Sequence, residues 1–297
     1  MISLYQQRLN LDGCTFSRLD HDDAIVAVVY RVIQPNNNQL ILKICSRSQD
    51  YFREIYYLNY FKGVLPVARI INVVEPEANI QGAILMECFP GSLLQTTSLN
   101  EELAYELGSL LAHIHLNRAL GYGDLTEPQH LSPDPRVYFT NKFEEGFEEC
   151  QNHLPTDLLE QCRRYFDGHI SLLTSVDGPC IIHRDFRPGN IIVNKGKLLG
   201  IIDWASGRAS FAEEDFCPLG LGEWSIGMAN KKSFLKGYSS IRPLPDYKAI
   251  MPLLQLNRTI ATIGFTVKHG TWKERSSRLY NINREFLQNF FKDKGRV

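Results

Sequence analysis

Three polar residues, Asp185, Asn190 and Asp203, are spaced so that they could act together on a phosphate group. Two apolar segments, residues 191–193 and 198–202, read as strands joined by a short turn. Such a hairpin brings the loop before its first strand close to the end of its second strand. Mg²⁺ takes one or two carboxylates together with phosphate oxygens, so Asn190 and Asp203 are candidate metal ligands. Asp185 is then left to accept a proton from a substrate hydroxyl, which is the layout of a phosphoryl-transfer site.

The segment around these residues resembles the catalytic loop of kinases. Residues 183–190 read His-Arg-Asp-Phe-Arg-Pro-Gly-Asn, similar to H-R-D-L-x-x-x-N, and Asp203 lies where the metal-binding Asp of D-F-G would be. Trp204 follows Asp203 in place of Phe-Gly. This Asp-Trp pair and the Pro-Gly-Asn run resemble the aminoglycoside phosphotransferase family, small-molecule kinases with a protein-kinase-like fold that are related to choline kinases. The competing interpretation is a buried loop rich in turn-forming residues.

The resemblance implies a nucleotide site in the first third of the chain. Lys43 lies among apolar neighbours in a strand, where a kinase holds the lysine that binds the α- and β-phosphates. Glu54 follows in the next helix, where the carboxylate that pairs with this lysine is expected. The plain alternative for either residue is a charge on a solvated face.

The next implied feature is the adenine-binding segment, residues 83–91, which resembles the family's strand-to-hinge connection. Met86 would lie behind the adenine, and the backbone of Glu87, Cys88 and Phe89 would supply its hydrogen bonds. An edge strand that enters a Pro-Gly turn is the alternative. The cofactors implied by the resemblance are ATP or GTP, with Mg²⁺.

Arg187 is a second candidate catalytic residue, because it stands where protein serine/threonine kinases carry a catalytic-loop lysine. A guanidinium there could neutralise charge on the transferring phosphoryl group, or it could pair with a nearby carboxylate. His183 is expected to support the loop by hydrogen bonding. Arg184 contacts activation-loop phosphate in protein kinases, but this chain has no A-P-E motif and little sequence for such a loop.

One departure from a kinase concerns the loop expected to cover the phosphates. Residues 19–24 contain no glycine and carry three aspartates, which would repel a triphosphate. The assignment of this segment as a phosphate-binding loop therefore stays open. A nucleotide-binding pseudokinase is the alternative of a different class that this departure favours.

The elements that must position these residues predict an α+β, bilobal, protein-kinase-like fold. A β-rich N-terminal nucleotide-binding lobe at 1–88 joins a mostly helical C-terminal catalytic and acceptor-binding lobe at 89–297, with a hinge near 87–91. In the first lobe we expect strands at 24–33, 39–45, 69–74 and 82–88, and a helix at 50–61 capped by Asp50. In the second lobe we expect helices at 99–116, 137–150 and 156–175, a strand-and-loop region at 179–203, and mostly helices over about 210–293.

Composition excludes several other classes of protein. The 297 residues are 44% hydrophobic and 22% charged, as in ordinary globular proteins. No apolar stretch approaches the roughly 18 residues that span a bilayer, and residues 1–10 are not a signal-peptide core. The seven cysteines are scattered without a C-x-x-C pair, which favours reduced thiols in a cytoplasmic protein.

Charge is unevenly distributed, although the formal net charge is −1. Residues 121–224 carry nine basic and seventeen acidic side chains, whereas residues 225–297 carry fourteen basic and four acidic ones. The two blocks could pair with each other across the second lobe, or the basic end could bind an anion. Nucleic acid is not the expected partner, and the oligomeric state is not indicated.

The acceptor is expected to be a small molecule with a hydroxyl group. Acidic side chains in the middle of the chain would attract a cationic aminoglycoside; they are Glu144, Glu145, Glu148, Glu149, Glu213, Glu214, Asp215 and Glu223. For residues 144–149, however, a solvated helix face is the favoured interpretation. Trp224, Tyr238 and Trp272 could form a cage for choline, although such residues more often belong to the core. Choline, a sugar, another amino alcohol and a macrolide stay open, as does, less favoured, a protein acceptor.

Overall fold

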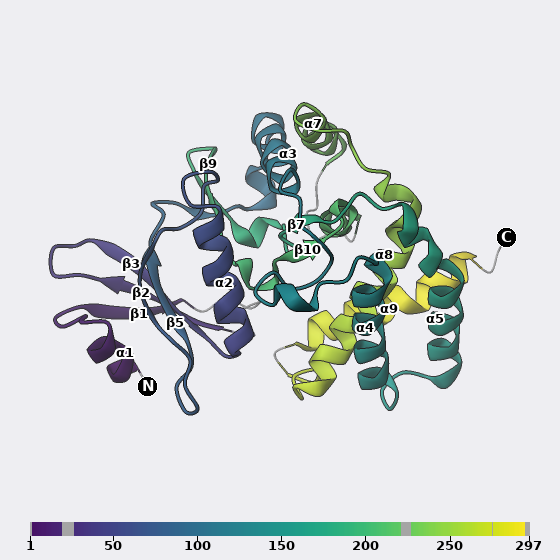
Figure 1. The fold of residues 1–297 in the computed structure, drawn as a ribbon, viewed down its shortest axis with the longest axis horizontal. Coiled ribbons are helices and arrows are strands. Elements are labelled where there is room, and N and C mark those ends of the chain that lie inside the picture. Colours follow the sequence, from purple (N-terminus) through teal and green to yellow (C-terminus); the bar gives the residue numbers. More distant parts are fainter. Residues whose placement is uncertain (1, 20–26, 221–226, 275, 295–297) are drawn as a thin grey trace.

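The computed structural model describes residues 2–19, 27–220, 227–274 and 276–294, and it has two lobes (Figure 1). The first lobe contains a five-stranded antiparallel sheet in the order β1-β2-β3-β5-β4. Its strands are β1 (Thr15–Leu19), β2 (Ala27–Ile33), β3 (Gln39–Cys45), β4 (Ile70–Val74) and β5 (Ala83–Glu87). The predicted hairpin is present as β2 and β3, and it pairs Val29 with Lys43. Residues 24–26 of its predicted first strand, and the loop 20–24, lie outside the described residues.

Helix α2 (Ser48–Tyr60) packs on this sheet (Figure 1), and its Glu54 accepts a hydrogen bond from Lys43 of β3. The prediction that Asp50 caps the helix is wrong, because the helix begins earlier and Arg47 is its N-cap residue. Asp50 is buried instead, and both of its carboxylate oxygens accept hydrogen bonds from the Arg47 guanidinium at 2.8 Å. A further helix, α1 (Ile2–Arg8), was not predicted; it buries Tyr5 in the small core beneath the sheet.

The second lobe is mostly helical, with two small sheets on the side that faces the first lobe (Figure 1). The strand β6 (Ser92–Leu93) pairs with the hairpin β8 (Ile191–Asn194) and β9 (Lys197–Ile201), and β7 (Cys180–Ile182) pairs with β10 (Arg208–Ser210). The described α-helices are α3 (Glu101–His115), α4 (Pro135–Cys150), α5 (Thr156–His169), α6 (Cys217–Gly220), α7 (Met228–Ser239), α8 (Tyr247–Lys268) and α9 (Ser277–Lys294). The helix predicted over 156–175 is α-helical only to His169, and its last turns, Ile170–Ser175, are a 3₁₀-helix.

One hydrophobic core is continuous between the two lobes. Tyr57 of α2 and Ile84 of β5 belong to the same buried cluster as Leu107 of α3, Ile191 of β8 and Trp204. Burial of large apolar side chains is the main favourable term in packing, so this cluster holds α2 and the β8–β9 hairpin together. A separate core joins α4, α5, α8 and α9. In the described part of the chain, no helix is both long and apolar enough to cross a membrane.

Helices α3 and α7 approach each other closely through glycines. A Cβ atom at Gly108 would lie 1.9 Å from the carbonyl oxygen of Phe234, so only glycine fits at this crossing.

Gly108→Ala is expected to lower the free energy of unfolding by about 1–3 kcal/mol, because overpacking outweighs the gain in helix propensity. Gly168→Ala on α5 is the matched control, since a Cβ atom there meets nothing within 4 Å. The control is expected to raise stability by up to about 1 kcal/mol in urea unfolding, and equal effects at both sites would contradict this packing argument.

Candidate active site

The loop between β7 and β8 is held in place by one buried carboxylate, that of Asp215. Its oxygens accept hydrogen bonds from the backbone N–H groups of His183 at 2.8 Å and Arg184 at 2.5 Å. The Nε2–H of His115, which is also buried, donates to the same carboxylate at 3.0 Å, and the Tyr238 hydroxyl donates to His115 Nδ1. Burial lowers the pKa of His115, which keeps its ring neutral in this arrangement. The sequence places Asp215 only among the acidic side chains that could attract an acceptor; its role in the loop has no sequence signal, because its partners lie 31 to 100 residues away.

His183 supports the loop from its other side. Its Nε2–H donates to the backbone carbonyl of Ile202 at 3.1 Å, which links the catalytic loop to the end of β9. The imidazole is fully buried and packs on the Trp204 ring, with centroids 4.5 Å apart. Burial lowers its pKa, so it stays neutral and acts as a structural hydrogen-bond donor. The hydrogen-bonding role expected of His183 is therefore present in the structure.

Asp185 lies between two arginines and one amide. The Nε of Arg187 donates to both carboxylate oxygens at 3.1 Å, and Arg258 Nη2 of α8 lies 3.7 Å from Oδ1. The side-chain amide of Asn190 donates to Asp185 Oδ2 at 2.7 Å. Burial opposes ionisation of Asp185, but the charges of Arg187 and Arg258 outweigh it and lower the pKa of the carboxyl group. Asp185 is therefore ionised at neutral pH and can accept a proton. No sequence pattern predicts the contact between Arg258 and Asp185, because the two residues are 73 positions apart in the chain.

Lys43 joins three elements through its ammonium group. Its Nζ donates to Glu54 Oε2 of α2 at 2.9 Å and to Asp203 Oδ1, just after β9, at 2.7 Å. Burial opposes the charge of Lys43, but the carboxylates of Asp203 and Glu54 raise its pKa above its usual value. Lys43 is therefore a permanent cation. It links Glu54, which the sequence predicted as its partner, to Asp203, which the sequence predicted as a metal ligand.

Asn190 and Asp203 fit a magnesium ion that arrives with a nucleotide. The Nδ2 of Asn190 is committed to Asp185, which leaves its carbonyl oxygen as the atom suited to a metal. Asp203 has a left-handed backbone (φ 65°) and a side chain that is 38% exposed, so its second oxygen can face a ligand. Mg²⁺ needs only one or two such protein oxygens besides phosphates and water. Consistently, the residues described by the structure contain no group of three or more His, Cys, Asp or Glu that could hold a metal alone.

The residues predicted to bind adenine lie at the end of β5 and directly after it. Met86 is buried at the end of β5, within the core shared by the two lobes. The backbone N–H of Glu87, however, donates to the Arg69 carbonyl at 2.9 Å, so this donor is already used within the sheet. Cys88 and Phe89 follow outside the strand, and the Phe89 ring packs over Gly200 of β9. An adenine base would therefore form its hydrogen bonds with backbone groups of residues 87–89 other than the N–H of Glu87.

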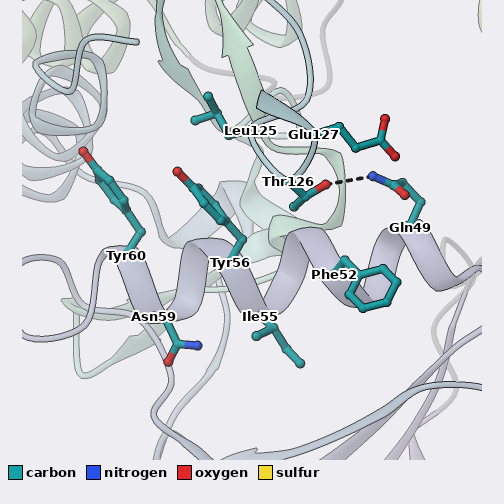
Figure 2. A pocket seen from close by; sticks show the side chains of 9 residues that line it. All are labelled: Gln49, Phe52, Ile55, Tyr56, Asn59, Tyr60, Leu125, Thr126 and Glu127. Atoms are coloured by element: carbon teal, nitrogen blue, oxygen red, sulfur yellow. Dashed lines mark hydrogen bonds between the residues drawn. The ribbon is translucent and has the colours of Figure 1, made fainter. Parts of the chain in front are cut away.

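Helix α2 is tied to the second lobe by polar contacts at its exposed side. Arg53 Nε and Gln49 Nε2 both donate to Asp124 Oδ2 at 2.6 Å. Gln49 also donates to the hydroxyl of Thr126, as Figure 2 shows, at the edge of a shallow pocket lined by α2 and residues 125–127. Because Arg53 directly precedes Glu54, these contacts fix the position of the carboxylate that pairs with Lys43.

The charged and aromatic groups proposed for an acceptor are mostly engaged elsewhere. Glu144 pairs with Arg163, and Lys268 of α8 lies 2.7 Å from Glu149 and 3.4 Å from Glu145. The acidic face of α4 is thus largely matched by basic groups, including the basic end of the chain. The aromatic cage is wrong for its two described members, because Tyr238 is fully buried against His115 and Trp272 packs on Tyr280 in a different core. Glu223 and Trp224 lie outside the described residues.

A polar cleft opens beside the catalytic loop. It is lined by residues 92–96, which follow the hinge, and by Arg187 and Gly189 of the loop. Arg187 therefore borders both Asp185 and the solvent-filled space next to it. Of the two candidate catalytic residues, Arg187 lines the cleft, and it contacts the other, Asp185.

The free energy of unfolding should depend on the pairing of Lys43 with Glu54 and Asp203. Lys43→Met removes the partner of Glu54, which is 2% exposed, and is expected to cost about 3–5 kcal/mol of unfolding free energy. Adding Glu54→Gln should recover part of this loss, because the orphaned buried charge is then gone. Urea unfolding of the single and double variants measures this coupling, and strictly additive losses would contradict it.

Comparisons with known proteins are consistent with this geometry. Residues 21–253 match the model of the phosphotransferase enzyme family, APH. A direct comparison with curated protein sequences gives no match. The solved structure of aminoglycoside phosphotransferase APH(4)-Ia superposes with a TM-score of 0.71 at 12% identity, covering 97% of this chain and 99% of the other. A GDP complex of an aminoglycoside 2'-phosphotransferase gives 0.70 at 12% identity and covers 98% and 96%. A gentamicin complex of APH(2")-IIa gives 0.69 at 15% identity and covers 96% and 94%.

At these low identities the structural matches establish the kinase-like bilobal fold that the sequence predicted. The family match spans most of the chain and includes Lys43, Asp185, Asn190 and Asp203. The chain therefore belongs to the phosphotransferase enzyme family and is a phosphotransferase of the small-molecule kinase type.

Proposed function

We propose that this protein transfers the γ-phosphoryl group of ATP, with Mg²⁺, to a hydroxyl group of a small molecule. The observation that carries the proposal is the convergence of Asp185, Asn190 and Asp203 around one loop, with Lys43 bound to Asp203 at 2.7 Å. A phosphoryl-transfer site needs a base, oxygen ligands for a metal and a cation for the phosphates, and these residues supply all three.

Asp185 acts on the acceptor. Its carboxylate is ionised because Arg187 and Arg258 lower its pKa, and it accepts the proton of the attacking hydroxyl group. The side-chain amide of Asn190 donates a hydrogen bond to Oδ2 of Asp185. This contact fixes the orientation of the carboxylate, and therefore the direction in which its other oxygen faces. Because the same contact uses the amide N–H, the Asn190 carbonyl oxygen is the side-chain atom that would bind the metal.

The remaining residues act on the nucleotide. Lys43, oriented by Glu54, binds the α- and β-phosphates, and residues 86–89 bind the base. Asn190 and Asp203 hold Mg²⁺, which when bound neutralises charge on the β- and γ-phosphate oxygens. Solved structures of the same fold include complexes with AMP-PNP, ADP and GDP, so GTP is the second nucleotide to test. The lobe boundary near residue 88 and the cytoplasmic location stay predictions.

The acceptor class is narrowed by the charges at the mouth of the site. Solved structures of this fold bind hygromycin B and gentamicin, which makes aminoglycosides the first class to test. In the described part of this chain, however, the charged side chains next to Asp185 are Arg187 and Arg258, and three of the four glutamates at 144–149 on α4 are paired with basic groups. These cations favour an acceptor with fewer positive charges, such as a sugar or a simple amino alcohol.

The proposal predicts the behaviour of Asp185→Ala. The variant should fold and bind AMP-PNP as the wild type does, because Asp185 makes no contact with Lys43 or Glu54. Transfer should fall by about 10²–10⁴-fold, the usual contribution of a general base. ADP release is measured with a panel of aminoglycosides, sugars, choline, amino alcohols and macrolides. Near-wild-type transfer by the variant would refute the assignment, and a wild type that binds nucleotide with Mg²⁺ yet transfers to no acceptor would favour a pseudokinase.

Arg187 gives a separate prediction. Its guanidinium borders the cleft and contacts Asp185, so it can stabilise charge that develops on the transferring phosphoryl group. Arg187→Ala should lower kcat by about 10²–10³-fold with little change in the KM for ATP. A variant that changes the KM alone, with kcat unaltered, would show that Arg187 serves binding and not the transition state.

A further inference from the structure

Arg208 of β10 is a buried cation without a matching anion. Its side chain belongs to a residue that is 4% exposed, and its Nε is buried without a hydrogen-bond partner among the described residues. Within the described chain no carboxylate forms an ion pair with it; the guanidinium lies over the ring of Tyr138, 4.5 Å from the centroid. A buried charge is unfavourable unless it is paired and hydrogen-bonded. The described surroundings of Arg208 therefore lack the anion that such a charge requires.

Other cations surround the same tyrosine. Arg208, Arg184, Lys142 and Arg53 all act on Tyr138, and although burial opposes ionisation of the phenol, together they lower its pKa. Asp124 pairs with Arg53, Glu145 pairs with Lys142, and Glu214 lies 3.8 Å from Arg184. Each of these three cations therefore has a carboxylate, and Arg208 is the excess charge among the described residues of the cluster.

Arg184 adds a second guanidinium on the solvent side. Its side chain is 32% exposed and reaches the cluster from a left-handed backbone position (φ 68°) in the catalytic loop. Burial is the main cause that lowers its pKa to about 10, and the nearby charge of Arg208 acts in the same direction. The Tyr57 hydroxyl is buried and has no partner in the described residues; burial and the charge of Asp124 raise its pKa, and the charges of Arg208 and Arg53 act weakly in the opposite direction. An anion between the arginines would relieve the repulsion and could accept these unused hydrogen bonds.

We propose that Arg184 and Arg208, with Arg53 and Tyr138 beside them, form a binding site for a phosphate-like oxyanion. We call these four residues the arginine site. Guanidinium groups bind phosphate through paired N–H donors, which suits a tetrahedral oxyanion better than chloride. The arginine site is separate from the metal and nucleotide residues, because none of its members contacts Lys43, Asn190 or Asp203.

The arginine site joins three elements that position the catalytic residues. Arg53 precedes Glu54 on α2, Arg184 precedes Asp185 in the loop, and Arg208 follows Asp203 on β10. An anion held by all three would fix α2 against the catalytic loop. The proposed ligand is free inorganic phosphate, so occupancy would depend on its concentration.

The test uses the full-length protein in a chloride buffer that contains no phosphate, sulfate or nucleotide. Sodium phosphate is titrated against sodium chloride at constant ionic strength, and the melting temperature is recorded. For the wild type the melting temperature should rise with saturation, since phosphate at ten times its Kd raises the folding equilibrium constant about elevenfold. A wild type that responds equally to both salts would overturn the proposal.

Arg208→Met is the informative variant. Without phosphate it should be at least as stable as the wild type, because it removes an unpaired buried charge, and it should lose the phosphate response. Arg208→Lys keeps the charge but not the paired donors, and its response should weaken by about tenfold or more. Arg164→Met on α5, whose exposed guanidinium lies 3.5 Å from Glu160, is the matched control and should respond as the wild type does. An Arg208→Met protein that still responds fully would place the phosphate elsewhere and overturn the proposal.

A second measurement does not depend on the variants folding. Crystals of the wild type grown without phosphate are soaked in tungstate, whose anomalous signal locates a phosphate analogue. A peak between the Arg184 and Arg208 guanidinium groups supports the arginine site, and peaks confined to other positions overturn it.

Discussion

The structure around the site depends on the buried positive charge of Lys43. Its ammonium group touches Glu54 of α2 and Asp203 after β9, so three segments far apart in the sequence must meet at one atom. A charge in this environment is tolerated only when both carboxylates are in place. The stacked rings of Tyr57 and Trp204, 5.6 Å apart, supply the apolar contact that keeps α2 and the Asp203 segment close enough for this. Asp203, the proposed metal ligand, is therefore positioned by the lysine that is proposed to bind the nucleotide phosphates.

The catalytic loop depends on a second buried charge of opposite sign. Asp215 binds two successive backbone N–H groups of the loop, and its pairing with His115 connects them to α3. Two supports thus act on opposite sides of the site: Lys43 sets where Asp203 lies, and Asp215 sets the backbone that carries Asp185. Asn190 connects the two supports, because it donates to Asp185 while β8, which begins at the next residue, pairs with the strand that leads to Asp203.

The sequence predicted the parts of the site that are local in the chain. Residues 183–203 form one loop and one hairpin, so their spacing already implies which side chains meet. Lys43 and Glu54 were found because the resemblance supplied a partner for each. Asp215 and Arg258 could not be found this way, because their contacts with the loop arise only when the second lobe folds. The helix boundary at Asp50 failed for a related reason: an Asp near a helix start is a capping signal, but Arg47 and burial gave this Asp a different role.

The uneven charge along the chain is resolved within the fold, and this changes what it says about the acceptor. Lys268 from the basic end neutralises glutamates of α4, and Arg242 pairs with Asp177, so segment totals mostly cancel inside the second lobe. A ligand is therefore affected mainly by the charges that lie next to its binding site, and not by the total charge of each segment. Two cations, Arg187 and Arg258, lie beside Asp185 and pair with it, and Arg208 lies over the ring of Tyr138. Two arginines beside one carboxylate make the immediate surroundings of Asp185 positive, although the formal net charge of the protein is −1, so a polycationic acceptor would meet positive charge at this residue.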